Sequence, residues 1–292
     1  MDELLRISLL QGQARAMLVK SDALVEEARQ IHALSRTATA ALGRLLTGTA
    51  MLGAMLKAPT DSVTTVIRGN GPMGRLLAVG SPGGDVKGYV EHPEVDPERK
   101  NGKLNVGGAV GNSGTLTVIK DMGLREPYVG QVHLVSGEIA EDFAMYFTAS
   151  EQTPSLVSLG VLVGEEVLSA GGLLVQMMPG ASEAAIASIE ASAGIFAGIS
   201  ATLRECTAQE AAQQLLAHLE MEILETMPLR YHCGCTRERV ERALLSLGKD
   251  ELKDMLAEQG GAEVGCSFCN RKQVFTAEEL KALIDILEHR EA

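Results

Sequence analysis

The chain has 292 residues, five of them cysteine, and a formal net charge of -12 at pH 7. Its length suits one to three domains with a sizeable core. That core is expected to be aliphatic, because hydrophobic residues make up 46% of the chain and aromatic residues only 3%. So negative a charge argues against a nucleic-acid partner held through its phosphates.

The N-terminal segment MDELLRISLLQGQARAMLVK lacks the basic stretch, apolar core and small-residue cleavage site of a signal peptide. The most apolar stretch of the chain is interrupted by Glu190, so no membrane span is predicted. We therefore expect a soluble, cytoplasmic protein with no membrane partner. Thiols are kept reduced in that compartment, so paired cysteines indicate metal binding or redox chemistry before they indicate structural disulfides.

Residues 1–179 are predicted to form an α+β domain. Residues 3–20 alternate loosely, as strands do. Residues 22–57 repeat apolar side chains every three or four positions, which predicts one long helix between a Ser21 cap and Pro59. Residues 63–178 then hold seven short β-branched runs separated by turn residues, with a helix inserted near the segment EIAEDFAMYFTASEQTPS. The expected sheet is mixed or mostly antiparallel.

Residues 180–230 are predicted to be a helical linker, because the composition shifts at Pro179-Gly180 towards Ala and Ser. A second helix is expected to start at a capping box of Thr207 and Glu210 and to end at Pro228. The Ala-rich part has few large side chains to bury, so its stability should depend on its neighbours.

Residues 231–292 are predicted to form a separate small domain. The expected order is a helix ended by Gly248, a helix ended by paired glycines, a tight hairpin, and a last helix opened by a capping box of Thr276 and Glu279.

Four of the five cysteines lie in two tight pairs within this small domain, as C-x-C and, after thirty residues, C-x-x-C. Zinc prefers four soft ligands in a tetrahedron, and a C-x-x-C turn lets two sulfurs converge. A domain of about sixty residues rarely builds a sufficient core without such a staple. We predict that one zinc ion is bound by four thiolates, those of Cys233, Cys235, Cys266 and Cys269. His232 is expected to be an exposed neighbour, and Cys206 an inert residue outside the pattern.

Other motifs predict no chemistry. The segment GGAVGNSGT, residues 107–115, lacks the lysine of a phosphate-binding loop and is expected to be a turn between strands. The carboxylates of EIAEDF are expected on a solvated helix face. With no catalytic triad and no dinucleotide fingerprint, the chain is not expected to be an enzyme.

The binding free energy of the predicted metal is large enough for its loss to unfold the small domain. Structural zinc contributes roughly 10–16 kcal/mol in small peptides, whereas a whole domain is stable by only about 5–15 kcal/mol. Oxidation of the thiolates would release the metal and unfold the last sixty residues. Disulfides between cysteines adjacent in sequence close short loops and would not replace the long-range staple. Apolar surface would then be exposed.

The segment HCGCTRERVERALLSLGKDELKDMLAEQGGAEVGCSFCNRKQVF resembles the C-terminal zinc module of the redox-regulated 33-kDa chaperonin family, the bacterial heat-shock holdase chaperones. SGEIAEDFAMYFTASEQTPS and AGGLLVQMMPG are similar to core-domain signatures of that family. The resemblance extends over nearly the whole chain, with no departure at the four cysteines and with Cys206 as an extra.

This resemblance implies a protein that is zinc-bound and inactive while reduced. Oxidative stress, especially with heat, would expel zinc and form the disulfides Cys233–Cys235 and Cys266–Cys269. The redox-sensing domain and the linker would then unfold. The protein would form a homodimer that holds unfolding client proteins without ATP, through a client-binding and dimerisation domain of residues 1–179.

Other functions stay open on the residues alone. A zinc-stapled adaptor would bind protein partners in either redox state, and a thiol oxidoreductase would use one cysteine pair catalytically. A nucleic-acid-binding zinc ribbon is disfavoured, because residues 230–292 hold ten Lys and Arg against twelve Asp and Glu. Candidate client contacts are the adaptable side chains of Met145, Met177 and Met178.

Overall fold

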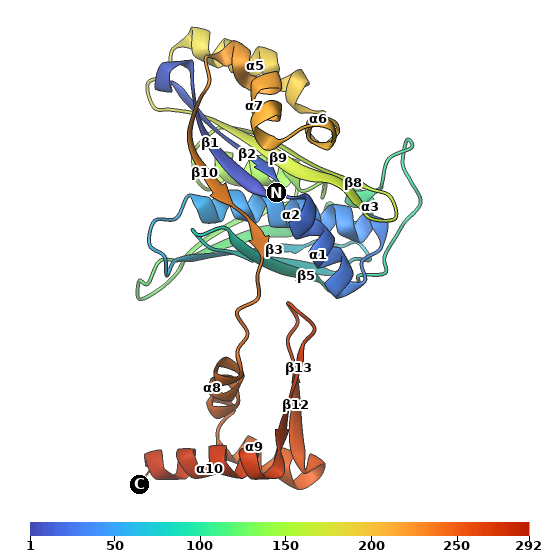
Figure 1. Cartoon of the computed structure of the whole chain (residues 1–292), viewed down its shortest axis with the longest axis vertical. Coiled ribbons are helices and arrows are strands. Elements are labelled where there is room, and N and C mark those ends of the chain that lie inside the picture. Colours follow the sequence, from blue (N-terminus) through green and yellow to red (C-terminus); the bar gives the residue numbers. More distant parts are fainter. Residues whose placement is uncertain (292) are drawn as a thin grey trace. The chain divides into compact units, whose positions relative to one another are not determined.

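The computed structural model describes residues 1–291 and divides the chain into two compact units, Met1–His232 and Cys233–Ala292. The first unit contains two sheets with a buried helix between them, and the second contains helices and one hairpin (Figure 1). The α+β prediction is confirmed.

A five-stranded antiparallel sheet brings together strands from both ends of the first unit. The strands β1 and β2 are joined by a short 3-10 turn, η1 (Leu10–Gly12). In spatial order the sheet consists of β10 (Glu222–Pro228), β1 (Glu3–Leu9), β2 (Ala14–Lys20), β9 (Val167–Met177) and β8 (Ser155–Val163).

A six-stranded sheet is formed by the middle of the chain, with antiparallel neighbours except for the parallel pair β11–β5. In spatial order it consists of β11 (Arg230–Tyr231), β5 (Asp85–Val90), β4 (Arg75–Gly80), β3 (Ser62–Arg68), β6 (Thr115–Asp121) and β7 (Tyr128–His133). In β3, β4 and β5 buried residues alternate with partly exposed ones, because successive side chains point to opposite faces. All the strands predicted within residues 63–178 are confirmed.

The helix α2 (Arg36–Ala54) lies between the two sheets and is buried almost all round, which is why small and apolar side chains occupy most of its surface. The prediction of one helix over residues 22–57 was wrong. The chain breaks after α1 (Asp22–His32), where Ala33 adopts a left-handed conformation and Ser35 caps a new helix by accepting a hydrogen bond from the Ala38 N–H.

Two shorter helices, α3 (Val106–Val110) and α4 (Ala140–Ala149), complete this part, and α4 is the predicted inserted helix. The glycine-rich segment of residues 107–115 was expected to be a turn between strands, but it contains most of the short helix α3 and packs against the chain near Gly69. A Cβ atom at Gly69 or Gly71 would clash with the backbone of α3, so this approach requires glycine.

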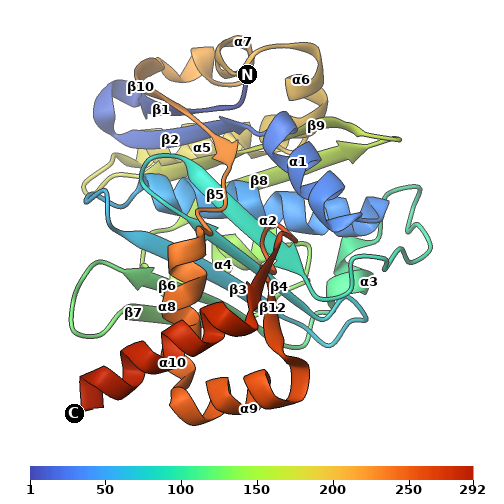
Figure 2. The same cartoon turned by 60° about the horizontal axis from the view of Figure 1, so that its bottom comes forward.

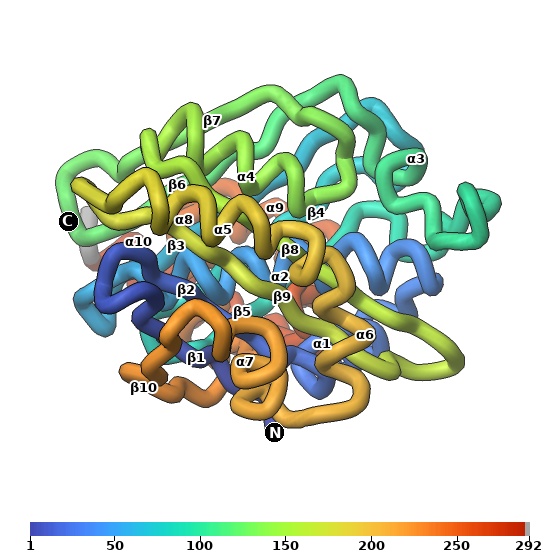
Figure 3. Tube along the Cα trace, turned by 90° about the horizontal axis from the view of Figure 1, so that it is seen from above, coloured from blue at the N-terminus to red at the C-terminus, as the bar shows by residue number. Residues whose placement is uncertain are grey.

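The outer face of the five-stranded sheet is covered by α5 (Glu183–Phe196), α6 (Ile199–Glu205), α7 (Ala208–Leu216) and the turn η2 (Ala217–Leu219) (Figure 3). Within residues 1–291 no single helix has the length and apolarity to cross a membrane, and the bent pair α5–α6 passes by length and composition alone.

The prediction of a helix running to Pro228 was wrong. The helix α7 starts at the predicted capping box but ends at Leu216, and Glu220 in a left-handed conformation redirects the chain. The residues of β10 then pair with the free edge of β1, where a terminal proline is tolerated. A functional division between a core of residues 1–179 and a linker of residues 180–230 stays a prediction.

The second unit has the predicted order of elements (Figure 2). It contains α8 (Arg237–Leu247), α9 (Lys249–Gln259), β12 (Gly261–Gly265), β13 (Lys272–Thr276) and α10 (Ala277–Glu291). Gly248 and Gly260, both at positive φ, end the first two helices, and the capping box opens α10. The small core consists of Leu244, Leu252, Ala262, Phe275, Leu280, Leu283 and Ile284.

Candidate metal centre

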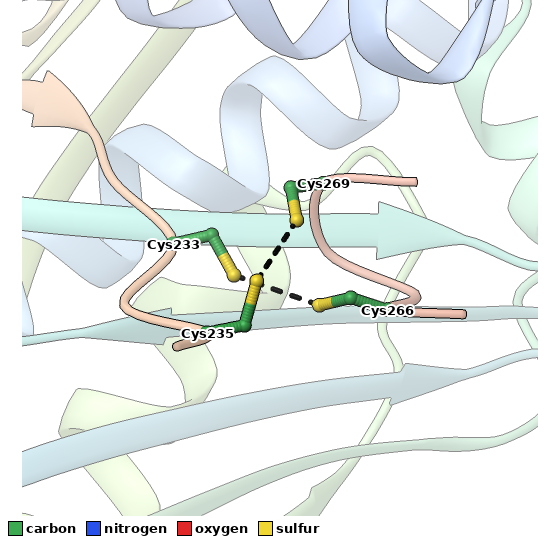
Figure 4. A group of neighbouring side chains, drawn as sticks. All are labelled: Cys233, Cys235, Cys266 and Cys269. Carbon is green, nitrogen blue, oxygen red and sulfur yellow. Dashed lines mark hydrogen bonds between the residues drawn. The ribbon is translucent and has the colours of Figure 1, made fainter. Parts of the chain in front are cut away.

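Four thiols of the second unit converge on one point (Figure 4). The sulfur atoms of Cys233, Cys235, Cys266 and Cys269 all lie within 4.8 Å of one another. The first two come from the segment that precedes α8, and the last two from the turn between β12 and β13. The structure therefore brings together the four residues that the spacing singled out.

The C-x-x-C turn is shaped by backbone hydrogen bonds at the tip of the hairpin. The N–H groups of Cys269 and Asn270 donate to the carbonyl of Cys266 at 3.3 and 2.8 Å, and the Cys266 N–H donates to the Arg271 carbonyl at 3.0 Å. Asn270 adopts a left-handed conformation, which asparagine tolerates better than most residues. This turn directs both sulfurs to one side of the hairpin.

The separations between sulfurs are compatible with a tetrahedral thiolate site. Cys235 Sγ and Cys269 Sγ are 3.2 Å apart, and Cys233 Sγ and Cys266 Sγ are 3.6 Å apart. Metal–sulfur bonds of about 2.3 Å in a tetrahedron place the sulfurs roughly 3.8 Å from one another. Each close contact joins one thiol of each pair, so a bound metal would cross-link two segments far apart in sequence.

The charge balance of the cluster favours a cation at its centre. Burial raises the pKa of Cys233, and burial with the neighbouring thiols of Cys269 and Cys233 raises the pKa of Cys235 to about 12. Burial also acts to raise the pKa of Cys269. Hydrogen bonds from the Arg271 N–H, the Cys235 thiol and the Arg271 side chain outweigh it and lower that pKa to about 7. The protein alone therefore does not stabilise four thiolates together, whereas a soft divalent metal would.

The other residues considered from the sequence lie outside this cluster. His232 is exposed, and its backbone N–H donates to the Val86 carbonyl. Cys206 lies in the first unit at the end of α6, where its thiol donates to the Thr202 carbonyl at 3.0 Å and burial raises its pKa. Met145 and Met178 are exposed, and Met177 is half-buried.

Sequence reasoning missed two arginines beside the cysteines. Arg271 supplies the backbone and side-chain hydrogen bonds that lower the pKa of Cys269. Arg237 is the first residue of α8, and its side chain reaches the hairpin that contains the second cysteine pair. The one signal available was the position of Arg237, because a cation at a helix N-terminus opposes the helix dipole.

Comparisons with known proteins agree over nearly the full length. The family described as Hsp33 protein matches residues 2–276. The chain is 47% identical over 286 residues to the 33 kDa chaperonin of Clostridioides difficile (strain 630), covering 97% of this chain and 98% of that protein. It is 45% identical over 289 residues to the 33 kDa chaperonin of Bacillus subtilis (strain 168), covering 98% and 99%.

A solved structure has a similar fold. The crystal structure of the 33 kDa chaperonin, a heat shock protein 33 homolog, from Thermotoga maritima superimposes with a TM-score of 0.87 at 40% sequence identity. The superposition covers 98% of both chains.

Proposed function

Since this chain belongs to the Hsp33 family of chaperones, we propose that it is a redox-regulated, ATP-independent holdase chaperone. In this proposal the reduced protein is zinc-bound and inactive, and oxidation activates it. The observation that carries the proposal is the convergence of four thiols within 4.8 Å in the unit with the smaller core.

Zinc is the metal that the donor set favours. Four thiolates in a tetrahedral arrangement are typical of structural zinc sites, and the soft sulfur ligands disfavour magnesium or calcium. Cys233, Cys235, Cys266 and Cys269 would bind one ion. The ion would offset part of their negative charge and cross-link the segment before α8 to the hairpin.

Oxidation would remove this cross-link. For each disulfide two zinc-bound thiolates lose two electrons to one molecule of peroxide, which takes up two protons from the solvent and becomes two molecules of water. The proposed disulfides are Cys233–Cys235 and Cys266–Cys269, each within one segment. The closest sulfurs belong to different pairs, so bonding within the pairs requires the side chains to turn away from their present neighbours. The two segments would then no longer be joined.

Loss of the metal would unfold residues 231–292 and loosen residues 180–230. The binding energy of structural zinc, roughly 10–16 kcal/mol, is comparable with the stability of a whole domain, about 5–15 kcal/mol. Ile186 and Ile195 of α5 are already exposed, and unfolding would add the apolar faces of α5 to α7. Such surface binds the apolar segments of unfolded or oxidatively damaged client proteins.

The remaining parts of the proposal concern assembly and location. We propose that the active form is a homodimer, that residues 1–179 form its client-binding and dimerisation domain, and that the protein works in the cytoplasm. It acts by holding clients, with no catalysed reaction and no nucleic-acid or membrane partner.

The decisive experiment follows zinc release with a colorimetric chelator during peroxide treatment at raised temperature, with far-UV circular dichroism on the same sample. We expect zinc release coupled to loss of helix, followed by suppression of client light scattering, and reversal of both by dithiothreitol. Disulfides would be mapped by mass spectrometry. Zinc retained with intact structure would contradict the switch and favour a constitutive zinc-stapled adaptor.

A further inference from the structure

Arg237 occupies an unfavourable place for a cation. It is the first residue of α8, two residues after Cys235, and the positive end of the helix dipole disfavours a guanidinium there. The next residue, Glu238, is of the type that a helix N-terminus prefers. Within its own helix Arg237 pairs with Glu241, whose Oε1 lies 3.5 Å from Nε, and its other side-chain contacts lie outside that helix.

Three such contacts reach the second half of the unit. The Arg237 guanidinium donates to the Val274 carbonyl at 3.3 Å and to Glu279 Oε1 at 2.6 Å. It also stacks over the Phe275 ring, 4.3 Å from the ring centroid. Val274 and Phe275 belong to β13, the strand that leaves the C-x-x-C turn, and Glu279 lies in the first turn of α10.

One side chain therefore spans the two segments that contain the two cysteine pairs. Its helix follows Cys233 and Cys235 directly, and its contacts follow Cys266 and Cys269 directly. The buried core residue of α8, Leu244, lies about two turns further along the helix, and the partly buried Val240 and Leu245 also pack against the core. Nothing in the Arg237 contacts involves a sulfur atom, so they do not need the metal.

We propose that Arg237 is a positioning residue that holds the two cysteine pairs at the separation the metal requires, and that it keeps holding them after the metal leaves. This inference rests on the metal-binding part of the proposed function and not on its chaperone part. Arg237 prolongs the residence of zinc and delays the separation of the two segments during oxidation.

The stacked arrangement gives Arg237 more effect than an ordinary surface ion pair. The side chains of Arg237 and Glu279 are 40% and 45% exposed, so their charge attraction alone is weak. Phe275, however, is only 1% exposed, and the planar guanidinium covers its ring while also donating to the neighbouring carbonyl. Lysine offers neither the planar stack nor the forked donors, so it is a poor substitute.

The test measures zinc release to a chelator at constant temperature under reducing conditions, together with the absorption bands of the cobalt(II)-substituted full-length protein. The variants are R237A, R237K and E279Q, the last of which keeps a residue suited to the capping box of α10. Two controls remove charges of the same unit. R239A changes an exposed arginine of α8 whose side chain has no hydrogen bond or ion pair with residues 1–289. K253A breaks the Lys253–Glu288 pair between α9 and α10.

We expect R237A to release zinc roughly five- to tenfold faster and to shift or broaden the cobalt bands, which report tetrahedral geometry and not overall stability. R237K should resemble R237A, E279Q should show a smaller change, and both controls should match the wild type. The inference fails if R237A, R237K and E279Q release zinc at the wild-type rate with unchanged bands, or if K253A accelerates release as much as R237A. A wild type that binds neither metal would overturn the proposed function as well.

Discussion

The two units are stabilised in different ways. In the first, α2 is buried between two sheets, and the core residues continue from one sheet through this helix to the other. In the second, a few buried side chains surround one hairpin, and the thiols of four cysteines meet at a single point. Stability that is spread over many contacts resists a chemical change at any one of them. Stability that depends on one point is controlled by the chemistry of that point.

The largest effect should come from removing one ligand of the proposed metal site. We expect C269S to lose zinc and to unfold the second unit, because the metal contributes on the order of 10 kcal/mol. The first unit should stay folded. Zinc content and hydrogen exchange by mass spectrometry would show protection lost in residues 233–291 and retained in the two sheets. C206S is the matched control and should keep its zinc; loss of zinc there would contradict the assignment.

A core substitution in the first unit should show the opposite pattern. Leu45 of α2 is fully buried between the sheets, so L45A should cost about 2–5 kcal/mol of unfolding free energy through lost burial and an unfilled cavity. Urea denaturation would measure the cost, and zinc content should be unchanged. Zinc loss in L45A would show that the two units do not respond independently.

Much of the difference between the two units was predictable from the sequence, because the patterns that predict it are local. β-branched runs predicted the strands of the first unit, and short cysteine spacings predicted the thiol cluster. The misses came from distant partners. The break after α1 depends partly on Asp96, which binds Thr37 at the start of α2. The strand β10 exists because β1 offers an edge more than two hundred residues away in sequence.

The candidate site was predictable in composition but not in arrangement. The four cysteines follow from spacing, whereas the close approach of Cys235 to Cys269 requires the fold. The contacts of Arg237 with β13 cross thirty-seven residues of sequence. The position of Arg237 at the start of a helix marks it as unusual, but it does not identify partners so far away in sequence.

The pH dependence of metal binding should sharpen the comparison further. Cys233 and Cys235 have raised pKa values, so the metal must displace their protons across the neutral range. Cys269, with a pKa of about 7, contributes a displaced proton below that pH and none well above it. Zinc affinity should therefore rise with pH. The number of protons released per zinc ion bound, which is the slope of log affinity against pH, should fall by about one as the pH passes through about 7.

Proton release on zinc binding would be measured by titration calorimetry in buffers of different ionisation enthalpy. The first unit contains none of these thiols. Its thermal midpoint, measured over the same pH range, is therefore the internal control for effects of pH on the rest of the protein. A proton release that stays constant from pH 6 to pH 8 would contradict the lowered pKa of Cys269.

The smallest effects compare one motif in both units. Thr207 caps α7 and Thr276 caps α10, each with a glutamate three residues later in a capping box. Replacing either threonine by alanine should cost about 1 kcal/mol of local stability, which is roughly a fivefold loss of hydrogen-exchange protection in the first turn of the helix. In T207A the cost should stay local, because α7 packs its alanines on a broad sheet face, and zinc release should be unchanged.

In T276A the destabilised first turn of α10 follows directly on the strand that leaves the cysteine turn. Zinc release should therefore become up to fivefold faster. Equal zinc release in T207A and T276A would contradict this difference between the units. If T207A alone accelerated release, the stability of residues 180–230 would control the metal, and the weak point of the molecule would lie in α5 to α7 instead of at the thiols.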